Sequence, residues 1–231
     1  MLTEICCDGL DAAKNAVQAG ARRVELCSDL SAGGITPPYS EIEAAAALEA
    51  KVNVLIRPRS GNFVYSIAEA DKMMREIAFC GTAGVNGIVV GALCSDYSVD
   101  MRFCREFIAM ARSYGLSVTF HRAVDEALLH ALGGRIPSRE EDFDNAAKGA
   151  VAKIMADIIA LTPDRILTSG GAPTAFEGRF VIREMRRLAG SEGPLIMPGG
   201  GVTSENAEAI ISASGVSEIH GSRLSLLGLQ A

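Results

Sequence analysis

Short apolar runs alternate with longer amphipathic stretches along the whole chain. The apolar runs predict β-strands because they are short and end at glycine, proline or polar residues. The amphipathic stretches predict helices, and several of them end at a glycine, which suits the left-handed C-cap of a helix. Strands are predicted at 2–6, 22–27, 52–57, 86–91, 116–121, 164–169, 194–198 and 217–221. Helices are predicted at 10–19, 40–48, 68–80, 99–114, 142–161, 176–188 and 204–213.

This alternation predicts parallel βαβ units, and eight strands in 231 residues favour a single-domain (β/α)8 TIM barrel over residues 1–231. A doubly wound open sheet is the alternative, but its first turn would carry GxGxxG, and here that segment is CDGLDAA. Only SRLSLLGLQA follows the last strand, so we expect a shortened or missing eighth helix. Residues 124–139, which include Gly133 and Gly134, predict an extended loop.

Polar residues gather where the predicted strands end, and these ends carry the chemistry of TIM barrels. In the strand RVELC, alternation puts Glu25 and Cys27 on the same face. A buried carboxylate needs a partner, and we expect one from Arg57 or Arg59 on the next strand. The candidate residues at the other strand ends are Glu4, Cys6, His121 and His220.

The segment PGGGVTSENA follows the seventh strand and predicts an anion site. Glycines let backbone N–H groups approach an anion, and a helix N-terminus carries partial positive charge. We expect Ser204 to cap the next helix. The predicted anion ligands are Gly199, Gly200, Gly201, Ser222 from the next loop, and Arg59.

Net charge, apolar runs and cysteine spacing limit the classes of partner and the cellular location that we expect. The net charge is −6 and no run is dense in lysine or arginine, which argues against nucleic acid and anionic membranes. No apolar run approaches the ~20 residues of a membrane span, and the N-terminus does not resemble a secretory signal. The six cysteines lack CxxC spacing, which indicates a cytoplasmic protein without a disulfide framework. The apolar tail and missing helix predict a homodimer or higher homo-oligomer.

Successive segments resemble the motif blocks of the CutC family of copper homeostasis proteins, in order and over nearly the whole chain. The blocks are EICCDGLDAAKNAVQAGARRVELCSDLSAGGITP, VLIRPRSGNFVYS, GIVVGAL, VTFHRAVD, RILTSGG, IMPGGGVTSEN and EIHGS. The resemblance implies a cytoplasmic (β/α)8 barrel, with copper ligands at Cys6 and Cys27. Cys7, Cys94 and a longer segment before RILTSGG depart from the family pattern.

Two functions are therefore predicted. The first is copper homeostasis, with soft Cu(I) bound by Cys6 and Cys27 at the barrel mouth. The alternative is an enzyme of isomerase or lyase type acting on a small phosphorylated or carboxylated metabolite held by the loops after strands seven and eight. In that case Arg57 or Arg59 would bind the anion, and Glu25 or His121 would move a proton. Neither function calls for an organic cofactor.

Overall fold

The computed structural model describes residues 1–229 and contains eight strands within that range. All eight lie at the predicted positions, with ends that differ by one or two residues. The strands are β1 (Leu2–Asp8), β2 (Arg23–Cys27), β3 (Lys51–Leu55), β4 (Gly87–Val90), β5 (Ser117–Phe120), β6 (Arg165–Thr168), β7 (Leu195–Pro198) and β8 (Glu218–Gly221).

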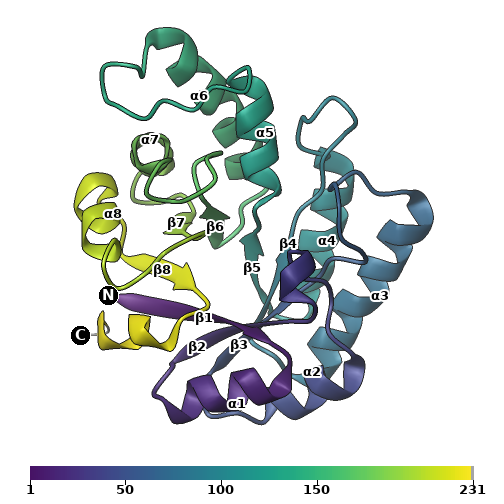
Figure 1. The fold of residues 1–231 in the computed structure, drawn as a ribbon. Helices are drawn as coiled ribbons and strands as arrows, with labels where there is room; N and C mark the ends of the chain where they lie inside the picture. The colour runs from purple at the N-terminus through teal and green to yellow at the C-terminus, as the bar shows by residue number, and fades with distance from the viewer. Residues whose placement is uncertain (230–231) are drawn as a thin grey trace.

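The helices connect successive strands and cover the outside of the sheet (Figure 1). Two short 3-10 helices, η1 (Leu30–Ala32) and η2 (Leu224–Leu229), follow β2 and β8. The α-helices are α1 (Leu10–Gln18), α2 (Tyr39–Ala46), α3 (Ile67–Ala83), α4 (Met101–Ser113), α5 (Ala123–Ala131), α6 (Asn145–Ala160), α7 (Arg179–Ala189) and α8 (Ala207–Ser214).

The strands form one parallel sheet in the order β7-β6-β5-β4-β3-β2-β1-β8. Its end strands β7 and β8 lie side by side, so the sheet curls into a nearly closed barrel. The side chain of Arg23 in β2 helps to join these two strands across the barrel interior. Its Nη2 donates to Met197 Sδ in β7 at 3.1 Å and pairs with Glu218 Oε2 in β8 at 2.6 Å. The predicted (β/α)8 barrel is confirmed.

Alternation along β2 separates the two faces of the barrel wall. Val24 and Leu26 belong to the large apolar core that the strands share with the surrounding helices. Cys27 belongs instead to a small cluster with Leu55 and Val89 inside the barrel. Because side chains two residues apart share a face, Glu25 also points into the barrel.

The predicted loop at 124–139 is wrong in its first part, because Ala123–Ala131 is helix α5. Val124, Ala127 and Leu128 are buried at the three- and four-residue spacing of one helix face. Gly133 and Gly134 both have positive φ, which ends the helix and begins an irregular segment that runs to α6. The two glycines thus mark the end of a helix rather than a loop over the whole stretch.

The helix expected after the last strand, β8, is shortened, as predicted. In the part of the chain that the structure describes, η2 is the only helix after β8, and its Leu226 is fully buried against β1. The last two residues of the predicted apolar tail, 230–231, lie outside the described residues. Within residues 1–229, no helix is both long and apolar enough to cross a membrane.

Candidate functional site

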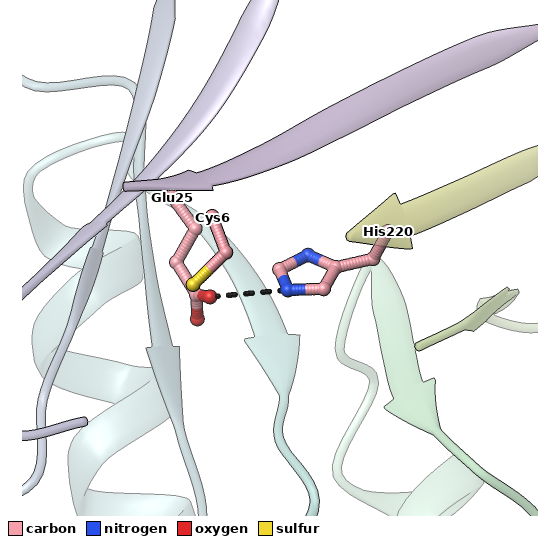
Figure 2. Close-up of side chains that lie close together, drawn as sticks. All are labelled: Cys6, Glu25 and His220. Carbon is pink, nitrogen blue, oxygen red and sulfur yellow. Dashed lines mark ion pairs between the residues drawn. The ribbon is translucent and has the colours of Figure 1, made fainter. Parts of the chain in front are cut away.

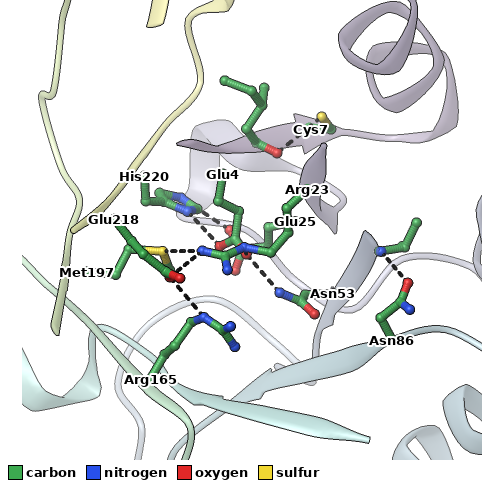
Figure 3. A network of polar contacts seen from close by, with 12 residues as sticks. Glu4, Cys7, Arg23, Glu25, Asn53, Asn86, Arg165, Met197, Glu218 and His220 are labelled. Atoms are coloured by element: carbon green, nitrogen blue, oxygen red, sulfur yellow. Dashed lines mark hydrogen bonds and ion pairs between the residues drawn. The ribbon is translucent and has the colours of Figure 1, made fainter. Parts of the chain in front are cut away.

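A buried polar network occupies the barrel interior beneath the mouth (Figure 3). Glu4 is fully buried, and its Oε2 lies 2.7 Å from Arg23 Nε and accepts from Asn53 Nδ2 at 2.7 Å. Its Oε1 lies 3.0 Å from His220 Nδ1. Burial alone would raise the pKa of Glu4, but the hydrogen bond with His220 and the charge of Arg23 outweigh burial and lower the pKa to about 2. Glu4 is therefore an ionised anchor for its three partners.

His220 is oriented by this anchor toward the mouth. Because Nδ1 faces Glu4, its Nε2 faces Glu25 Oε2 at 3.4 Å. Cys6 completes a group in which one ligand atom from each residue lies within 4.8 Å of the others (Figure 2). Burial raises the pKa of Glu25, opposed by the charge of His220. Burial disfavours charged His220, but Glu25 and Glu4 outweigh it and raise the pKa of that imidazole.

Two thiols meet beside this group. Cys6 Sγ lies 3.8 Å from Cys27 Sγ, and Cys27 Sγ also contacts the carbonyl oxygen of Cys7 at 3.4 Å. The register explains the approach, because Cys6 lies opposite Glu25 and Cys27 follows two residues later on the same face. The hydrogen-bonding contact with Cys27, burial and the charge of Glu25 all raise the pKa of the Cys6 thiol well above its usual value.

The extra cysteine, Cys7, is not part of this site. It is 1% exposed, belongs to the outer apolar core and contacts the carbonyl oxygen of Ile5. Adjacent residues on a strand face opposite sides, so Cys6 and Cys7 differ by one position but lie on opposite faces of the barrel wall.

A cavity of about 440 Å³ opens at the mouth. It brings together most of the residues that the sequence predicted for metal binding, catalysis or anion binding. Gly199 and Arg59 are the exceptions and are not among its lining residues. The predicted residues that line the cavity are Cys6, Glu25, Cys27, Arg57, His121, Gly200, Gly201 and Ser222, together with His220.

The predicted pairing of Glu25 with Arg57 or Arg59 is wrong. Strand β3 ends at Leu55, so the alternation that would aim Arg57 at Glu25 stops before it. The Arg57 guanidinium instead donates to the carbonyls of Gly33, Gly34 and Gly61, at 2.9, 3.0 and 2.6 Å. It thereby fixes the loops at the cavity edge.

The Arg59 side chain binds residues around the start of α3 and does not line the mouth cavity. Its Nε pairs with Glu69 Oε1 at 2.6 Å, and Glu69 forms a capping box with Ser66. Its other nitrogens donate to the carbonyl oxygens of Asn62 and Val64. Arg57, Arg122 and Arg223 line the cavity, and Arg122 is the one whose Nη1 faces Gly200 of the glycine run.

Ser204 does not cap a helix, contrary to expectation. Helix α8 begins at Ala207, and Asn206 holds the preceding turn by accepting from the Thr203 amide and donating to the Gly201 carbonyl. Gly200 and Gly201 have φ of 95° and 66°, values that favour glycine. The glycine run is therefore a turn that lines the cavity, with α8 starting farther along the chain.

Sequence reasoning missed the anchoring roles of Arg23, Glu218 and Asp125. Arg23 shares the inward face of β2 with Glu25 and Cys27, so strict alternation would have revealed it. Asp125 accepts from the amides of Ser169 and Gly171, at 2.9 and 3.0 Å, and from the Thr168 hydroxyl at 2.6 Å. It lies in the stretch that was predicted to be a loop.

Comparisons with known proteins agree with this architecture. The model of the CutC family matches residues 1–132 and 140–225. A CutC protein of Agrobacterium fabrum is 38% identical over 96% of this chain and 79% of its own length. The human copper homeostasis protein cutC homolog is 36% identical over 95% of this chain and 72% of its own. A crystal structure of CutC from Streptococcus agalactiae superposes with a TM-score of 0.81 at 31% identity, covering 97% of this chain and 99% of that one.

Proposed function

The chain belongs to the CutC family, and from that membership and the geometry of the barrel mouth we propose that it serves copper homeostasis by binding Cu(I) between Cys6 and Cys27. The observation that carries the proposal is the 3.8 Å separation of the two sulfurs at the cavity. Cu(I) is a soft ion that selects thiolate ligands.

The sulfur pair has the right spacing for one shared ion. Thiolate–metal bonds are about 2.3 Å long for zinc, so two sulfurs 3.8 Å apart are closer than twice that length. One ion of similar size can therefore contact both sulfurs in a bent arrangement. The bend leaves a side open for a third ligand, and His220 Nε2 and a Glu25 oxygen lie close to Cys6.

Support for His220 as that third ligand comes from its own partner. Metal-binding histidines commonly donate their second ring nitrogen to a carboxylate, which fixes the ring and its tautomer. Glu4 contacts His220 Nδ1 in this manner, and Glu4 is itself held by Arg23 and Asn53. Imidazole suits copper, whereas the carboxylate of Glu25 suits harder ions.

The name of the human relative favours copper over the alternative of an isomerase or lyase. A cytoplasmic location remains a prediction, and the six free cysteines of the chain are consistent with a reducing compartment. The homo-oligomer also remains a prediction. Leu224 and Leu195 are exposed apolar residues, but Leu226 already covers part of the barrel wall.

The proposal is tested by titrating the reduced protein with Cu(I) against a chromophoric chelator without oxygen. We expect one tightly bound equivalent in the wild type and in Cys94→Ser, because Cys94 does not line the cavity. Zn²⁺ should bind more weakly than Cu(I), although Cys, Glu and His are all possible zinc ligands. Failure to retain Cu(I) against the chelator, or tighter binding of Zn²⁺, would contradict the proposal.

The role of Glu4 gives a second prediction. Glu4→Gln should lower the Cu(I) affinity by about 10–100-fold, because mutation of an outer-shell partner typically has an effect of that size. The same competition titration measures it, with circular dichroism to check the fold. Glu43→Gln is the matched control, since Glu43 is exposed on α2, and it should leave the affinity unchanged. Equal affinities for the wild type and Glu4→Gln would remove His220 from the proposed site.

A further inference from the structure

One buried ring nitrogen at the mouth lacks a hydrogen-bond partner among residues 1–229, and it is not used by the copper site. His121 follows β5, is 3% exposed and lines the cavity. Its Nδ1 accepts from the Ala123 amide at 3.2 Å, which leaves the ring proton on Nε2. Within the described residues, Nε2 has no hydrogen-bond partner. Leaving a buried donor without an acceptor is unfavourable, so this atom calls for an acceptor from outside the chain.

The His121 ring is held in place and kept neutral. Phe63 packs on it with ring centroids 4.7 Å apart. Gly91 makes room beside the ring, because a Cβ there would come within 2.7 Å of Nδ1. Burial, followed by the nearby charge of Arg57, lowers the pKa of His121 to about 3. The ring is thus a fixed neutral donor near physiological pH.

Further donors line the same cavity. Within residues 1–229, the backbone N–H groups of Gly200, Gly201 and Ser222 meet no protein acceptor. The adjacent Arg122 guanidinium reaches Asp125 through Nε and the Ser169 hydroxyl through Nη2. Its Nη1 faces the glycine turn, at 3.3 Å from the position of a Cβ on Gly200. Without a side chain, Gly200 leaves that space open.

Positive charge at this part of the mouth is only partly balanced. The buried Arg57 guanidinium contacts carbonyl oxygens and stacks on Phe63, and no carboxylate of the described residues lies within ion-pair distance of it. Glu25 is the carboxylate that lines the cavity, and it contacts His220. A guanidinium without a carboxylate partner, in a cavity with N–H donors that lack an acceptor, favours a negatively charged ligand.

We propose that the mouth cavity binds a small organic oxyanion, a phosphate ester or a carboxylate, with one oxygen accepting from His121 Nε2 and others from the Gly200–Gly201 turn and Arg122. The 440 Å³ volume is in the range of about 300–1,000 Å³ that is typical of small-molecule sites. The ligand would sit beside the thiols, and its binding requires no copper.

The test uses copper-free full-length protein and three probes: inorganic phosphate, glycerol 3-phosphate and malonate, with glycerol as the neutral control. ¹H–¹⁵N spectra of the histidine rings follow His121 and His130 separately. We expect millimolar amounts of at least one anion to shift the His121 ring signals, and to leave those of His130, which lies outside the cavity, unchanged. A larger shift with glycerol 3-phosphate than with malonate would identify the ligand class as phosphate esters, and the reverse would identify carboxylates.

A second experiment compares how anions stabilise two histidine variants. Anions such as phosphate also stabilise proteins without a site, so the quantity compared is the rise in melting temperature relative to His130→Gln at matched ionic strength. His121→Phe should weaken anion binding at least about tenfold, as loss of a hydrogen bond to a charged group does. It should keep its Cu(I) affinity, so the two proposals can fail separately.

Two results would overturn the anion site. One is the absence of any change in the His121 ring signals with all three probes. The other is equal stabilisation of His121→Phe and His130→Gln, which would show that the anions act on the protein surface in general. If His121→Phe does not fold, the wild-type spectra decide the question alone.

Discussion

Replacing both Cys6 and Cys27 with serine is expected to lower the Cu(I) affinity by at least about 100-fold, more than the loss of an outer-shell partner. A serine hydroxyl is a hard ligand that Cu(I) does not select, and the double variant removes both sulfurs of the 3.8 Å pair. His220 and Glu25 would remain, but neither supplies the thiolate that distinguishes copper from harder ions. Competition with a chromophoric Cu(I) chelator measures the change.

Cys7 provides the matched control for this experiment. Cys6 and Cys7 are neighbours in β1, yet Cys7 lies in the outer apolar core and makes no contact with the cavity. Cys7→Ser should therefore retain the wild-type affinity, even if the buried hydroxyl lowers the stability of the fold. A loss as large as that of the double variant would mean that Cu(I) binding depends on the outer face of β1 and not on the pair at the mouth alone.

Arg23→Met is expected to lower the free energy of unfolding by about 3–5 kcal/mol. Arg23 is 1% exposed and pairs with both Glu4 and Glu218 inside the barrel. Methionine fills similar space but leaves Glu4 without the cation that helps keep it ionised, and a buried charge that loses its partner is costly. Chemical denaturation, followed by circular dichroism, measures the change.

An exposed ion pair serves as the control for the buried pairs of Arg23. Lys14 and Asp11 lie 3.6 Å apart on α1, with side chains 48% and 96% exposed, so Lys14→Met should cost less than about 1 kcal/mol. Adding Glu4→Gln to Arg23→Met should recover part of the loss, since the carboxylate that lost its cation is then neutral, whereas Glu218 keeps Arg165 as a partner at 2.9 Å. A similar small loss for Arg23→Met and Lys14→Met would show that the interior network contributes little to stability.

The barrel could be predicted because its strands are short, apolar and regularly spaced. The prediction failed at α5, where Gly133 and Gly134 dominated the interpretation of the whole segment. The residues before them, from Ala123 to Ala131, are mostly good helix formers with a buried face. A glycine pair gives the position where a helix ends, and it does not exclude the helix before it.

The site was predictable where strand geometry determines it. Alternation and neighbouring strand ends place Glu25, Cys6 and Cys27 together, and in the structure Cys6 Sγ lies within 4.8 Å of a Glu25 oxygen and 3.8 Å from Cys27 Sγ. Arg57 and Ser204 were misassigned because both follow the end of regular structure, where side-chain direction depends on loop contacts. For Arg57 those contacts are the carbonyls of Gly33, Gly34 and Gly61, which no local pattern reveals.

X-ray absorption at the copper edge tests the central claim most directly, because it reports the atoms bound to the metal. For the protein loaded with one equivalent of Cu(I), we predict a first shell with two sulfur scatterers, from Cys6 and Cys27, and a nitrogen from His220. In the double serine variant the sulfur contribution should disappear. A first shell of nitrogen and oxygen alone in the wild type, or sulfur that persists in the double variant, would contradict the proposed site.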